Sequence, residues 1–438
     1  MSMGRLMLLS CLVYGLLILG LLSIKGDLIA LAIPLVIYLG AALVYGPGKP
    51  NLSATRTVNP TYVTQGTPVV VKLSIVNQGM QLEEVLIDDP IPPSLELVEG
   101  EPRMVATLPP GGRLELSYTV RGRRGIITFL PVEATASDPL GLFRRRVRLS
   151  APAQLLIKPE VVKLKPVTIR PRRTHGFIGP LPARRGGNGV NFYGVRDYQF
   201  GDPQRRVNWK ATARHDQGLY TNEFEQEQIT DVGLILDARQ QTDVLSRDSS
   251  LFEHSIRAAA ALADVFLSGG HRVGLLIYGR GQEATFPGYG KRQRERILRS
   301  LAQARTGDNM ALESLNYLPT RFFPARSQIV LVSPLSANDL PVLTSLRAHG
   351  YQVLVISPDP VAYEVGLVGQ GRELVKELEL AVRIARLERI LLLRRLQKFG
   401  IRVVDWQVDK SLNQVIHTTL VGVPGMMAQQ FRILGIEI

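Results

Sequence analysis

The sequence is poor in residues that cross-link or catalyse: it has one cysteine, six histidines and two tryptophans among 438 residues. Because Cys11 has no second thiol in the chain, an intramolecular disulfide is excluded, and the cysteine count leaves the redox compartment open. No zinc-finger spacing or aromatic-rich RNA-binding motif is recognisable. No motif places a serine or cysteine nucleophile beside a histidine, so the sequence gives no sign of nucleophilic catalysis.

Acidic residues are scarce in one long window. Between Arg121 and Arg214 the chain has 20 Lys and Arg against 5 Asp and Glu, a surplus of 15 beside a net charge of +14 for the whole chain. The basic clusters are RGRRG (121–125), RRRVR (144–148), RPRR (170–173) and ARR (183–185). Such a surplus suits anionic lipid headgroups, a nucleic acid, or a solvated face that meets a partner's acids. The missing nucleic-acid motifs favour lipid or protein.

Two long uncharged runs lie at the N-terminus. Leu6–Ile24 would form a helix about 28 Å long, enough to cross a bilayer core. Leu28–Tyr45 is the second run, and Pro34 within it is tolerable where neighbouring groups satisfy the freed carbonyl. The two runs predict a transmembrane hairpin. The alternative, a cleaved signal peptide and a buried helix, suits the first run less well because that run is long and lacks a small-residue cleavage site.

The charges that flank this hairpin predict its orientation. Arg5 precedes it and Lys49 and Arg56 follow it, whereas Lys25 in the turn is offset by Asp27. The positive-inside rule therefore places both ends in the cytoplasm, which predicts an inner-membrane protein with cytoplasmic soluble domains.

At 438 residues the chain is long enough for about two or three domains. From Leu52 to Pro159 apolar residues alternate with a period of two, as in Val69, Val71, Leu73 and Ile75, and turn-forming runs separate the strands. This pattern predicts an antiparallel β-sandwich. The run 166–191 is rich in Pro, Arg and Gly, which predicts a linker or an ordered loop.

Beyond Asp231 the pattern changes to continuous apolar runs that alternate with helical stretches. The predicted strands are 231–237, 272–279, 327–333, 351–357 and 401–406, and the predicted helices are 252–267, 292–304, 339–349 and 372–399. Continuous apolar strands between helices predict a parallel sheet covered on both faces, a doubly wound α/β domain. Ligands in such sheets bind at the carboxyl ends of strands, so the residues after Leu236 are the place to look. The many leucines of the last helix favour burial over a coiled-coil seam.

The stretch VRDYQFGDPQRRVNWKATARHDQGLYTNEFEQEQ (195–228) is unusually dense in charge. Asp202-Pro203 predicts a helix start, with the Asp202 carboxylate as the N-cap and the helix ending near Arg214. The following strand would project Glu223, Glu225 and Glu227 from one face, where they repel unless cations lie opposite.

Arginines within the same stretch supply those cations, so the favoured interpretation is a self-satisfying network with Trp209 packed beneath it. An anion site on the arginines and a metal site on the glutamates are alternatives. A catalytic site at His215 and Asp216 ranks last, because neighbours in a strand or turn do not face each other. The residues of this predicted structural or docking network are Arg196, Asp197, Tyr198, Gly201, Asp202, Arg205, Arg206, Trp209, Arg214, Glu223, Glu225 and Glu227.

The run RDYQFGDPQRRVNWKATARHDQGLYTNEFEQE resembles the signature of the bacterial and archaeal domain-of-unknown-function-58 family. Upstream, RGRRGIITFLPVEATASDPLGLFRR resembles a second signature of that family, and LLIKP resembles its following strand. The resemblance implies a von Willebrand factor A-like domain after the signature and an association with MoxR-type AAA+ ATPases.

Domains of this kind often bind a divalent cation through Asp-x-Ser-x-Ser after the first strand, together with a Thr and an Asp from later loops. Here Asp237 stands at the first position, but Arg239 and Gln241 replace the serines. Thr306 is placed for the threonine, and Ser333-Pro334 stands where the aspartate is expected. A guanidinium beside Asp237 is expected to pair with it, so the sequence predicts a degenerate site without a metal, and no cofactor.

These observations predict a non-enzymatic, membrane-anchored adaptor that presents a docking surface to a MoxR-type ATPase or to a client protein. The expected domains are a transmembrane hairpin (1–49), a β-sandwich (50–160), a basic linker with the signature (161–230) and a von Willebrand A-like domain (231–438). An enzyme that binds an anionic substrate on the arginines and a membrane-associated nucleic-acid-binding protein are the alternatives. The sequence leaves the oligomeric state open.

Overall fold

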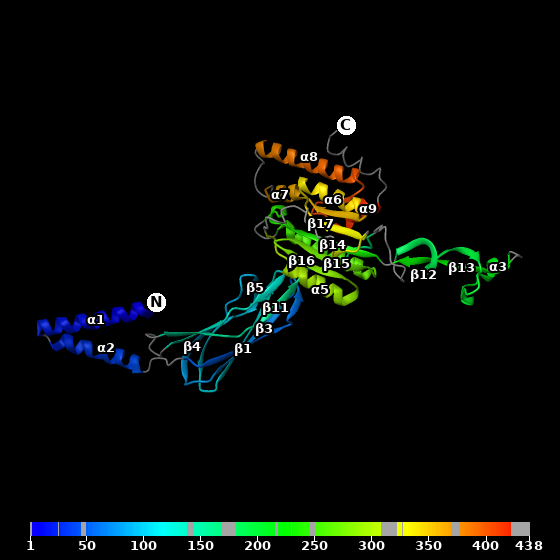
Figure 1. The fold of residues 1–438 in the computed structure, drawn as a ribbon. Coiled ribbons are helices and arrows are strands. Elements are labelled where there is room, and N and C mark those ends of the chain that lie inside the picture. Colours follow the sequence, from blue (N-terminus) through cyan, green and yellow to red (C-terminus); the bar gives the residue numbers. More distant parts are fainter. Residues whose placement is uncertain are drawn as a thin grey trace. The chain divides into compact units, whose positions relative to one another are not determined.

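The computed structural model describes the chain except residues 1, 25, 45–49, 138–143, 168–180, 215–217, 229, 246–249, 308–321, 326, 369–375 and 422–438. The chain divides into two compact units, Met1–Lys158 and Pro159–Ile438. Figure 1 labels many of the elements of both units.

Two apolar helices begin the first unit: α1 (Ser2–Ser23) and α2 (Gly26–Val44), which includes Pro34. Both helices lie where the uncharged runs predict them, and many of their apolar side chains are exposed, Leu8 and Leu22 by more than 70%. Within the described residues, however, none of the helices combines the length and the apolar character needed to cross a membrane. The helices are thus confirmed, but their assignment as transmembrane spans is not supported.

Strands form the rest of the first unit, and they pair antiparallel except for β2 and β11, which are parallel. Their bounds are β1 (Leu52–Asn59), β2 (Tyr62–Thr64), β3 (Val69–Asn77), β4 (Leu82–Asp88), β5 (Leu95–Gly100), β6 (Arg103–Leu108), β7 (Arg113–Gly122), β8 (Gly125–Thr128), β9 (Val132–Ser137), β10 (Arg144–Leu149) and β11 (Gln154–Lys158). The sheets β1-β3-β7-β5 and β10-β9-β4-β6 share one buried cluster, and the small sheet β2-β11-β8 shares another with the first sheet. Val69, Val71, Leu73 and Ile75 are all buried, which confirms the period of two.

A buried arginine links distant strands of this unit. The Arg56 guanidinium forms an ion pair with Asp89 and donates to the backbone carbonyls of Ala151 (2.7 Å) and Leu130 (3.0 Å). The hydroxyl of Tyr118 donates to Asp89 Oδ2 at 2.8 Å, and this oxygen also accepts from Arg56 Nε at 3.2 Å. Both side chains of the ion pair are fully buried, so this network belongs to the core.

The second unit contains a six-stranded sheet in the order β16-β15-β14-β17-β18-β19. Its strands are β14 (Asp231–Ala238), β15 (Arg272–Gly279), β16 (Gln282–Gly288), β17 (Gln328–Val332), β18 (Gln352–Pro358) and β19 (Arg402–Trp406). Five strands are parallel and lie where the apolar runs predict them, but the edge strand β16 runs antiparallel to β15. The sheet is therefore mixed rather than wholly parallel. The sequence did not predict β16, because this half-exposed strand lacks the apolar run that identifies a buried strand.

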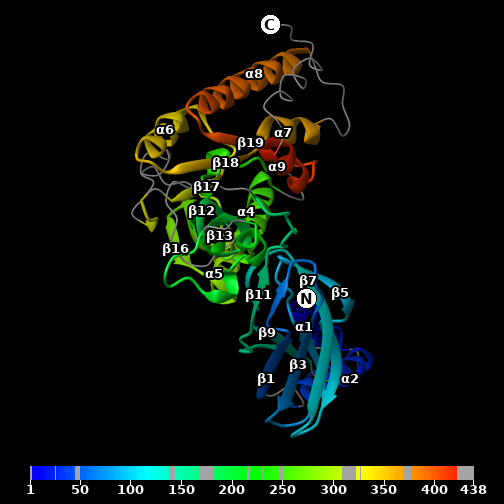
Figure 2. The same cartoon turned by 90° about the vertical axis from the view of Figure 1, so that its right-hand side faces the viewer.

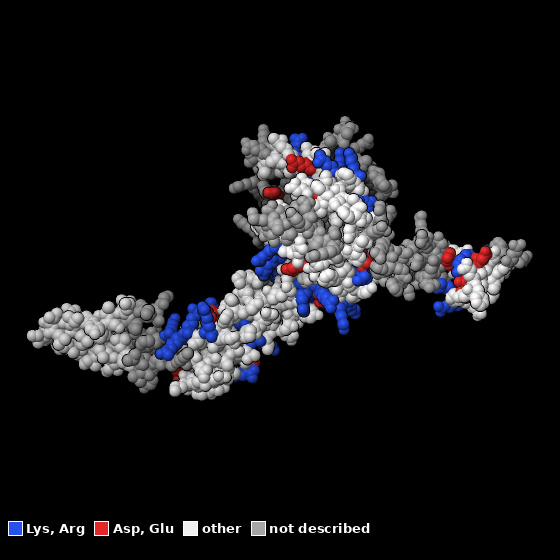
Figure 3. All heavy atoms as spheres, viewed as in Figure 1, with Lys and Arg blue, Asp and Glu red and all other residues white. Residues whose placement is uncertain are grey.

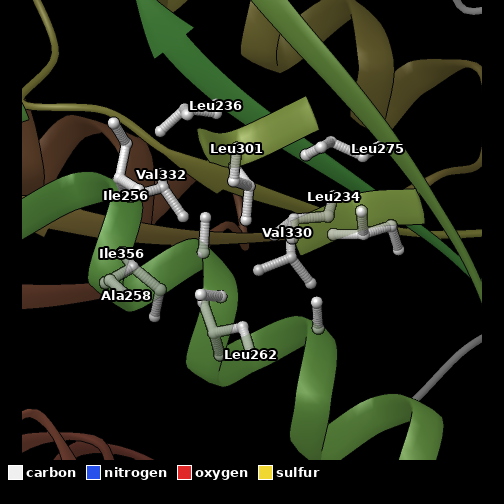
Figure 4. Close-up of a cluster of buried hydrophobic side chains, with 14 of the residues drawn as sticks. Leu234, Leu236, Ile256, Ala258, Leu262, Leu275, Leu301, Val330, Val332 and Ile356 are labelled. Carbon is white, nitrogen blue, oxygen red and sulfur yellow. The ribbon is translucent and has the colours of Figure 1, made fainter. Parts of the chain in front are cut away.

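Helices cover both faces of this sheet (Figure 2). They are α4 (Leu251–Ser268), α5 (Gly290–Gln303), α6 (Leu340–Ala348), α7 (Pro360–Val368), α8 (Lys376–Lys398) and α9 (Leu412–Val421). Alternate residues of β14 face opposite clusters: Leu234 and Leu236 meet α4, whereas Ile235 lies in the cluster that includes side chains of α6 and α8. Figure 4 shows the first cluster, in which Ile256 and Leu262 of α4 face side chains of the strands and Ile256 lies near Val332 and Ile356.

A two-stranded arm precedes the sheet in sequence. It consists of β12 (Leu181–Asp197) paired antiparallel with β13 (Tyr220–Gln228). Between the two strands lie the 3-10 turn η1 (Gln204–Arg206) and the short helix α3 (Trp209–Thr212). The prediction of a loop up to residue 191 is wrong from Leu181 onward, because β13 pairs with this segment and register shifts accommodate its glycines.

Candidate functional site

The carboxyl ends of β14 and β17 meet at a buried charged cluster. Asp237 is the seventh residue of β14, Arg239 follows the strand, and Ser333 follows β17. Asp339 closes the 3-10 turn η6 (Ala337–Asp339), where it forms a capping box with Ser336. Asp237, Arg239 and Asp339 are each no more than 3% exposed. The cluster therefore lies at the edge where ligands of parallel sheets usually bind, but its charged groups are buried.

Arg239 lies between the two carboxylates and binds each with two hydrogen bonds. Its Nε and Nη2 donate to Asp237 Oδ1 and Oδ2 at 2.9 and 2.7 Å. Its Nη1 and Nη2 donate to Asp339 Oδ1 and Oδ2, both at 2.9 Å. Such bidentate pairs are the strongest hydrogen bonds that side chains form. The expectation that the guanidinium pairs with Asp237 is confirmed, and Asp339 is a second partner that the sequence did not reveal.

Further donors bind both of these carboxylates. Ser333 Oγ donates to Asp237 Oδ2 at 2.6 Å, and the backbone N–H of Arg239 donates to Oδ1 at 3.1 Å. Asp339 Oδ2 also accepts from the backbone N–H of Ser336 at 2.8 Å. Burial alone would lower the pKa of Arg239, but the hydrogen bonds and charges of Asp237 and Asp339 outweigh it and raise that pKa above its usual value. The arginine is a permanent cation.

A second arginine extends this network along the strand ends. Arg389 of α8 donates to the carbonyl of Pro334 at 3.0 Å, directly after Ser333, and to the carbonyl of Ser357 at 3.1 Å. It also pairs with Asp405 of β19 at 2.6 Å. Burial raises the pKa of Asp405, and the charge of Arg389 only partly opposes that shift. Polar groups of the chain itself therefore occupy the ends of β14, β17, β18 and β19.

The other positions predicted for a degenerate metal site lie outside this cluster. Gln241 is in the exposed part of the 3-10 turn η2 (Gln240–Thr242). Thr306 precedes Gly307, whose backbone pairs with Arg239, and the contacts described do not join the Thr306 side chain to Asp237. Across the described part of the chain, no group of three or more His, Cys, Asp or Glu side chains is arranged to hold a metal ion. The positive charge beside Asp237 is thus supplied by Arg239.

The arm carries the signature stretch, and its inner residues bind one another. Arg196 forms a bidentate pair with Asp202, at 2.9 Å for both contacts, and its Nε lies 3.6 Å from Glu223 Oε1. The hydroxyl of Tyr198 donates to the backbone carbonyl of Asp202 at 3.0 Å, while Gly201 takes a positive φ of 106°. The hydrogen bond from Arg196 lowers the pKa of Asp202. One ion pair thus closes the turn from Gln199 to Asp202, in which the N–H of Asp202 donates to the carbonyl of Gln199.

Two local predictions about this stretch are wrong. Asp202 does not cap a helix over 203–214, because its carboxylate binds Arg196 and the backbone N–H of Gln199 instead. Asn208 caps the four-residue α3, accepting from the N–H of Ala211 at 2.9 Å. Trp209 does not pack beneath the network, since it is 68% exposed. An acidic residue before proline and an aromatic residue in a charged run each permit more than one partner, and local sequence does not choose between them.

The remaining signature residues lie at the surface of the arm or outside the described side chains. Arg205, Arg214 and Asp197 are exposed and Arg206 is half-buried, while its backbone carbonyl accepts from Thr221. The side chains of Glu225 and Glu227, and both His215 and Asp216, lie outside the described part. Figure 3 shows basic and acidic side chains intermixed at the end of the arm that carries α3.

Large apolar side chains are exposed on the same arm. Phe200 and Trp209 are 106% and 68% exposed, and Phe192 and Leu219 are 60% and 45% exposed. Arg205 and Lys210 lie beside them in sequence and are exposed as well. The sequence signal that could have revealed this surface is the presence of aromatics in a stretch whose neighbours are nearly all polar.

Comparison with known proteins finds a family match over part of the chain. The model of a family described as protein of unknown function DUF58 matches residues 194–383. The uncharacterized protein YeaD of Bacillus subtilis is 26% identical over 278 residues, which cover 62% of this chain and 67% of YeaD. The match confirms the resemblance that the signature predicts, and it includes both the arm tip and the strand-end cluster.

The similarity of this chain to solved structures is weak. The CARDB domain of a Pyrococcus furiosus protein, in complex with di-metal ions, is 14% identical, covering 26% of this chain and 96% of that domain with a TM-score of 0.18. A FixG-related protein of Vibrio parahaemolyticus is also 14% identical, covering 24% of this chain and 96% of its own, with a TM-score of 0.17. Scores this low carry no argument about fold or ligand.

Proposed function

We propose that this chain, a protein with the DUF58 region over residues 194–383, is a non-enzymatic adaptor that presents a protein-docking surface at a membrane. Its partner is a MoxR-type AAA+ ATPase, with which it works in the maturation or quality control of protein complexes. The resemblance of the signature to the family suggests this partner; the residues of the arm suggest where it docks.

The exposure of Phe200 and Trp209 on the arm carries this proposal. Aromatic residues and arginine are the side chains most enriched at the centres of protein interfaces, where they supply much of the binding energy. Here the aromatics stand beside Arg205 and Lys210, while the ion pair between Arg196 and Asp202 holds the backbone beneath them. A partner with apolar pockets and acidic residues would complement this surface.

The strand-end cluster supports docking that needs no metal. In the von Willebrand A-like domain that the resemblance implies, a divalent cation would sit beside Asp237 and mediate contact with a ligand. Here the guanidinium of Arg239 supplies the positive charge beside Asp237, and the Asp237 carboxylate already accepts four hydrogen bonds from Arg239 and Ser333. We therefore expect binding of the partner to be insensitive to chelators.

The helices α1 and α2 supply the membrane attachment in this proposal. Their described side chains are almost entirely apolar, and many are exposed, including Leu19, Leu31 and Ile37. Exposed apolar surface of this extent marks a site of contact with lipid or with another protein. Flotation of the full chain with vesicles, lost when Leu19 and Leu31 are both replaced by Asp, would support lipid contact.

The docking surface is tested by a photo-crosslinking amino acid placed at Trp209 of the full chain in native membranes. A matched control places the same amino acid at Tyr62, which is 53% exposed on the first unit. The proposal expects an AAA+ ATPase among the adducts at position 209, retained in the presence of EDTA and absent at position 62. Repeated experiments without an AAA+ ATPase at position 209, or equal adducts at both positions, would refute it.

A further inference from the structure

The helix α8 carries an apolar stripe that its own domain leaves exposed. Leu380, Ile384, Leu387 and Leu391 are 59%, 49%, 50% and 52% exposed. The opposite face of the helix is anchored, since Arg389, Leu393 and Leu396 are buried. Figures 1 and 2 show α8 on the outside of the sheet domain. The prediction that the leucines of this helix are simply buried against the sheet is therefore correct for one face only.

The direction of the stripe follows from the helix period. At about 100° per residue, the four stripe residues span roughly 60° of the helix circumference. The midpoint of this arc lies nearly opposite the midpoint of the arc formed by Arg389, Leu393 and Leu396. The stripe therefore faces away from the domain that holds the helix, where it is accessible to another molecule.

The spacing of the stripe is that of a coiled-coil seam. Its residues follow one another at intervals of four, three and four, so Leu380 and Leu387 take the d positions of a heptad and Ile384 and Leu391 the a positions. One of the two a positions, Ile384, is β-branched, and a β-branched residue at a with leucine at d favours two parallel strands over higher oligomers. Arg394 occupies the next d position and ends the seam, which is about 16 Å long.

Charges beside the stripe specify the orientation of a partner helix. Arg383 is at a g position and Glu388 at the following e position, and both are exposed. In a parallel, in-register pair, g of one helix faces the next e of the other, so Arg383 of each copy faces Glu388 of its partner. In an antiparallel pair centred on the same seam, Arg383 would face Ile390 and Glu388 would face Ala381. Opposite charges meet only in the parallel arrangement.

We propose that two copies of this chain pair through α8, parallel and in register, with Leu380, Ile384, Leu387 and Leu391 as the shared seam. The same residues serve both copies, so the contact closes after two chains. The seam is only four layers long, and therefore the pair forms reversibly and with a strength that depends on protein concentration.

The proposal is tested on the full chain in detergent by measuring its mass across micromolar concentrations. We expect a monomer–dimer equilibrium that Leu387→Glu abolishes. Leu378→Glu is the matched control, because this leucine lies on the same helix but outside the stripe and is 40% exposed. Trp406 fluorescence that is unchanged in a Trp209→Phe background verifies that the variants are folded. A wild-type chain that stays monomeric, or a dimer that resists Leu387→Glu, would overturn the proposal.

Charge exchange and cross-linking test the orientation. Arg383→Glu alone and Glu388→Arg alone should each weaken the dimer, and the two changes together should restore it. In a Cys11→Ser background, Leu387→Cys should form a disulfide between two copies on oxidation. Cross-linking only between a copy with Ile384→Cys and one with Leu387→Cys would show antiparallel helices and would overturn the parallel pair. This inference does not depend on the proposed function.

Discussion

Two buried arginines, Arg56 in the first unit and Arg239 in the second, hold carboxylates in different ways. Arg56 has one carboxylate partner, Asp89, and also donates to the backbone carbonyls of Ala151 and Leu130. Arg239 is clamped by two carboxylates, those of Asp237 and Asp339. The first network is neutral, whereas the second leaves one excess negative charge under burial.

The difference shows what each network is built for. A neutral pair that also satisfies backbone groups fixes the path of the chain, and it lies inside the core. A cluster with an excess carboxylate at the carboxyl edge of a parallel sheet has the composition of a cation site whose cation is a side chain. We infer that Arg56 acts only on stability, while Arg239 also determines what can bind at the strand ends.

The largest effect is expected from Arg239→Ser, which leaves Asp237 and Asp339 buried and uncompensated. Removing one partner of a buried ion pair costs about 3 to 5 kcal/mol. The measurement is the denaturant midpoint of Trp406 fluorescence in a Trp209→Phe background, since the chain has two tryptophans and Trp406 lies in β19. If the midpoint does not fall, the cluster does not stabilise the sheet domain.

The same variant tests whether the site can take an ion. Two carboxylates with the hydroxyls of Ser333 and the new serine offer only oxygen ligands, which suit Mg²⁺, Mn²⁺ or Ca²⁺. We expect these ions to raise the midpoint of Arg239→Ser but leave the wild type and Arg239→Met nearly unchanged. A clear shift of the wild type would mean that the cation site operates despite the arginine.

A somewhat smaller loss, about 2 to 4 kcal/mol, is expected from Asp89→Asn in the first unit. Arg56 then keeps its hydrogen bonds to the carbonyls of Ala151 and Leu130. Its buried positive charge is therefore better compensated than the negative charge of Asp237 is in Arg239→Ser. Hydrogen exchange of the β-sandwich amides, followed by mass spectrometry, measures this loss separately from the sheet domain. Divalent cations should not restore protection, and restoration would remove the contrast between the two networks.

The sequence predicted what depends on short separations along the chain. The strands around Val69–Ile75 and Asp231–Ala238 were predictable because burial repeats every two residues in the first and is continuous in the second. The pairing of Arg239 with Asp237 was predictable because the two residues are neighbours at a strand end. Asp339 was not, since it lies 100 residues away and reaches Arg239 only after β17 and η6 are in place.

The arm shows the other limit of sequence reasoning. Asp202 had two suitable donors, the free N–H groups of a helix start and the guanidinium of Arg196, and local propensity favoured the first. In the structure Asp202 binds the guanidinium of Arg196, because this partner forms two charge-assisted hydrogen bonds at once. The exposure of Trp209 was equally hidden, since its sequence neighbours do not reveal whether the arm has a core to pack it into.

A pH-dependent loss of stability is expected from His271, a buried side chain that carries no charge at neutral pH. Burial lowers the pKa of His271 from 6.5 to about 4, and its Nδ1 has no partner within the described structure. As the pH falls below 6.5, His271 binds a proton in the unfolded chain but not in the folded chain. Stability is therefore lost progressively until about pH 4. The shift corresponds to about 3 kcal/mol.

The measurement for this group is the unfolding free energy of the sheet domain between pH 7 and pH 4. His271→Phe, which keeps a ring beside Phe266, should remove most of the slope. His254 contributes in the same direction because burial also lowers its pKa, so the test is the difference between wild type and variant. Equal slopes in both would show that His271 is not held neutral.

The smallest effect is expected at the arm, where Arg196 and Asp202 repeat the bidentate geometry of Arg239 and Asp237 in contact with solvent. Water screens an exposed pair and solvates either partner once the other is removed, so geometry alone contributes little to global stability. Arg196→Ala should leave the Trp406 midpoint unchanged and instead speed hydrogen exchange around Tyr198 and Asp202. The matched control is Arg205→Ala. Because Arg205 is exposed and its side chain makes no described contact with this turn, this change should alter neither the midpoint nor the hydrogen exchange.

A midpoint of Arg196→Ala as low as that of Arg239→Ser would show that the arm is part of the core, and that bidentate geometry rather than burial determines how strongly these arginines stabilise the protein.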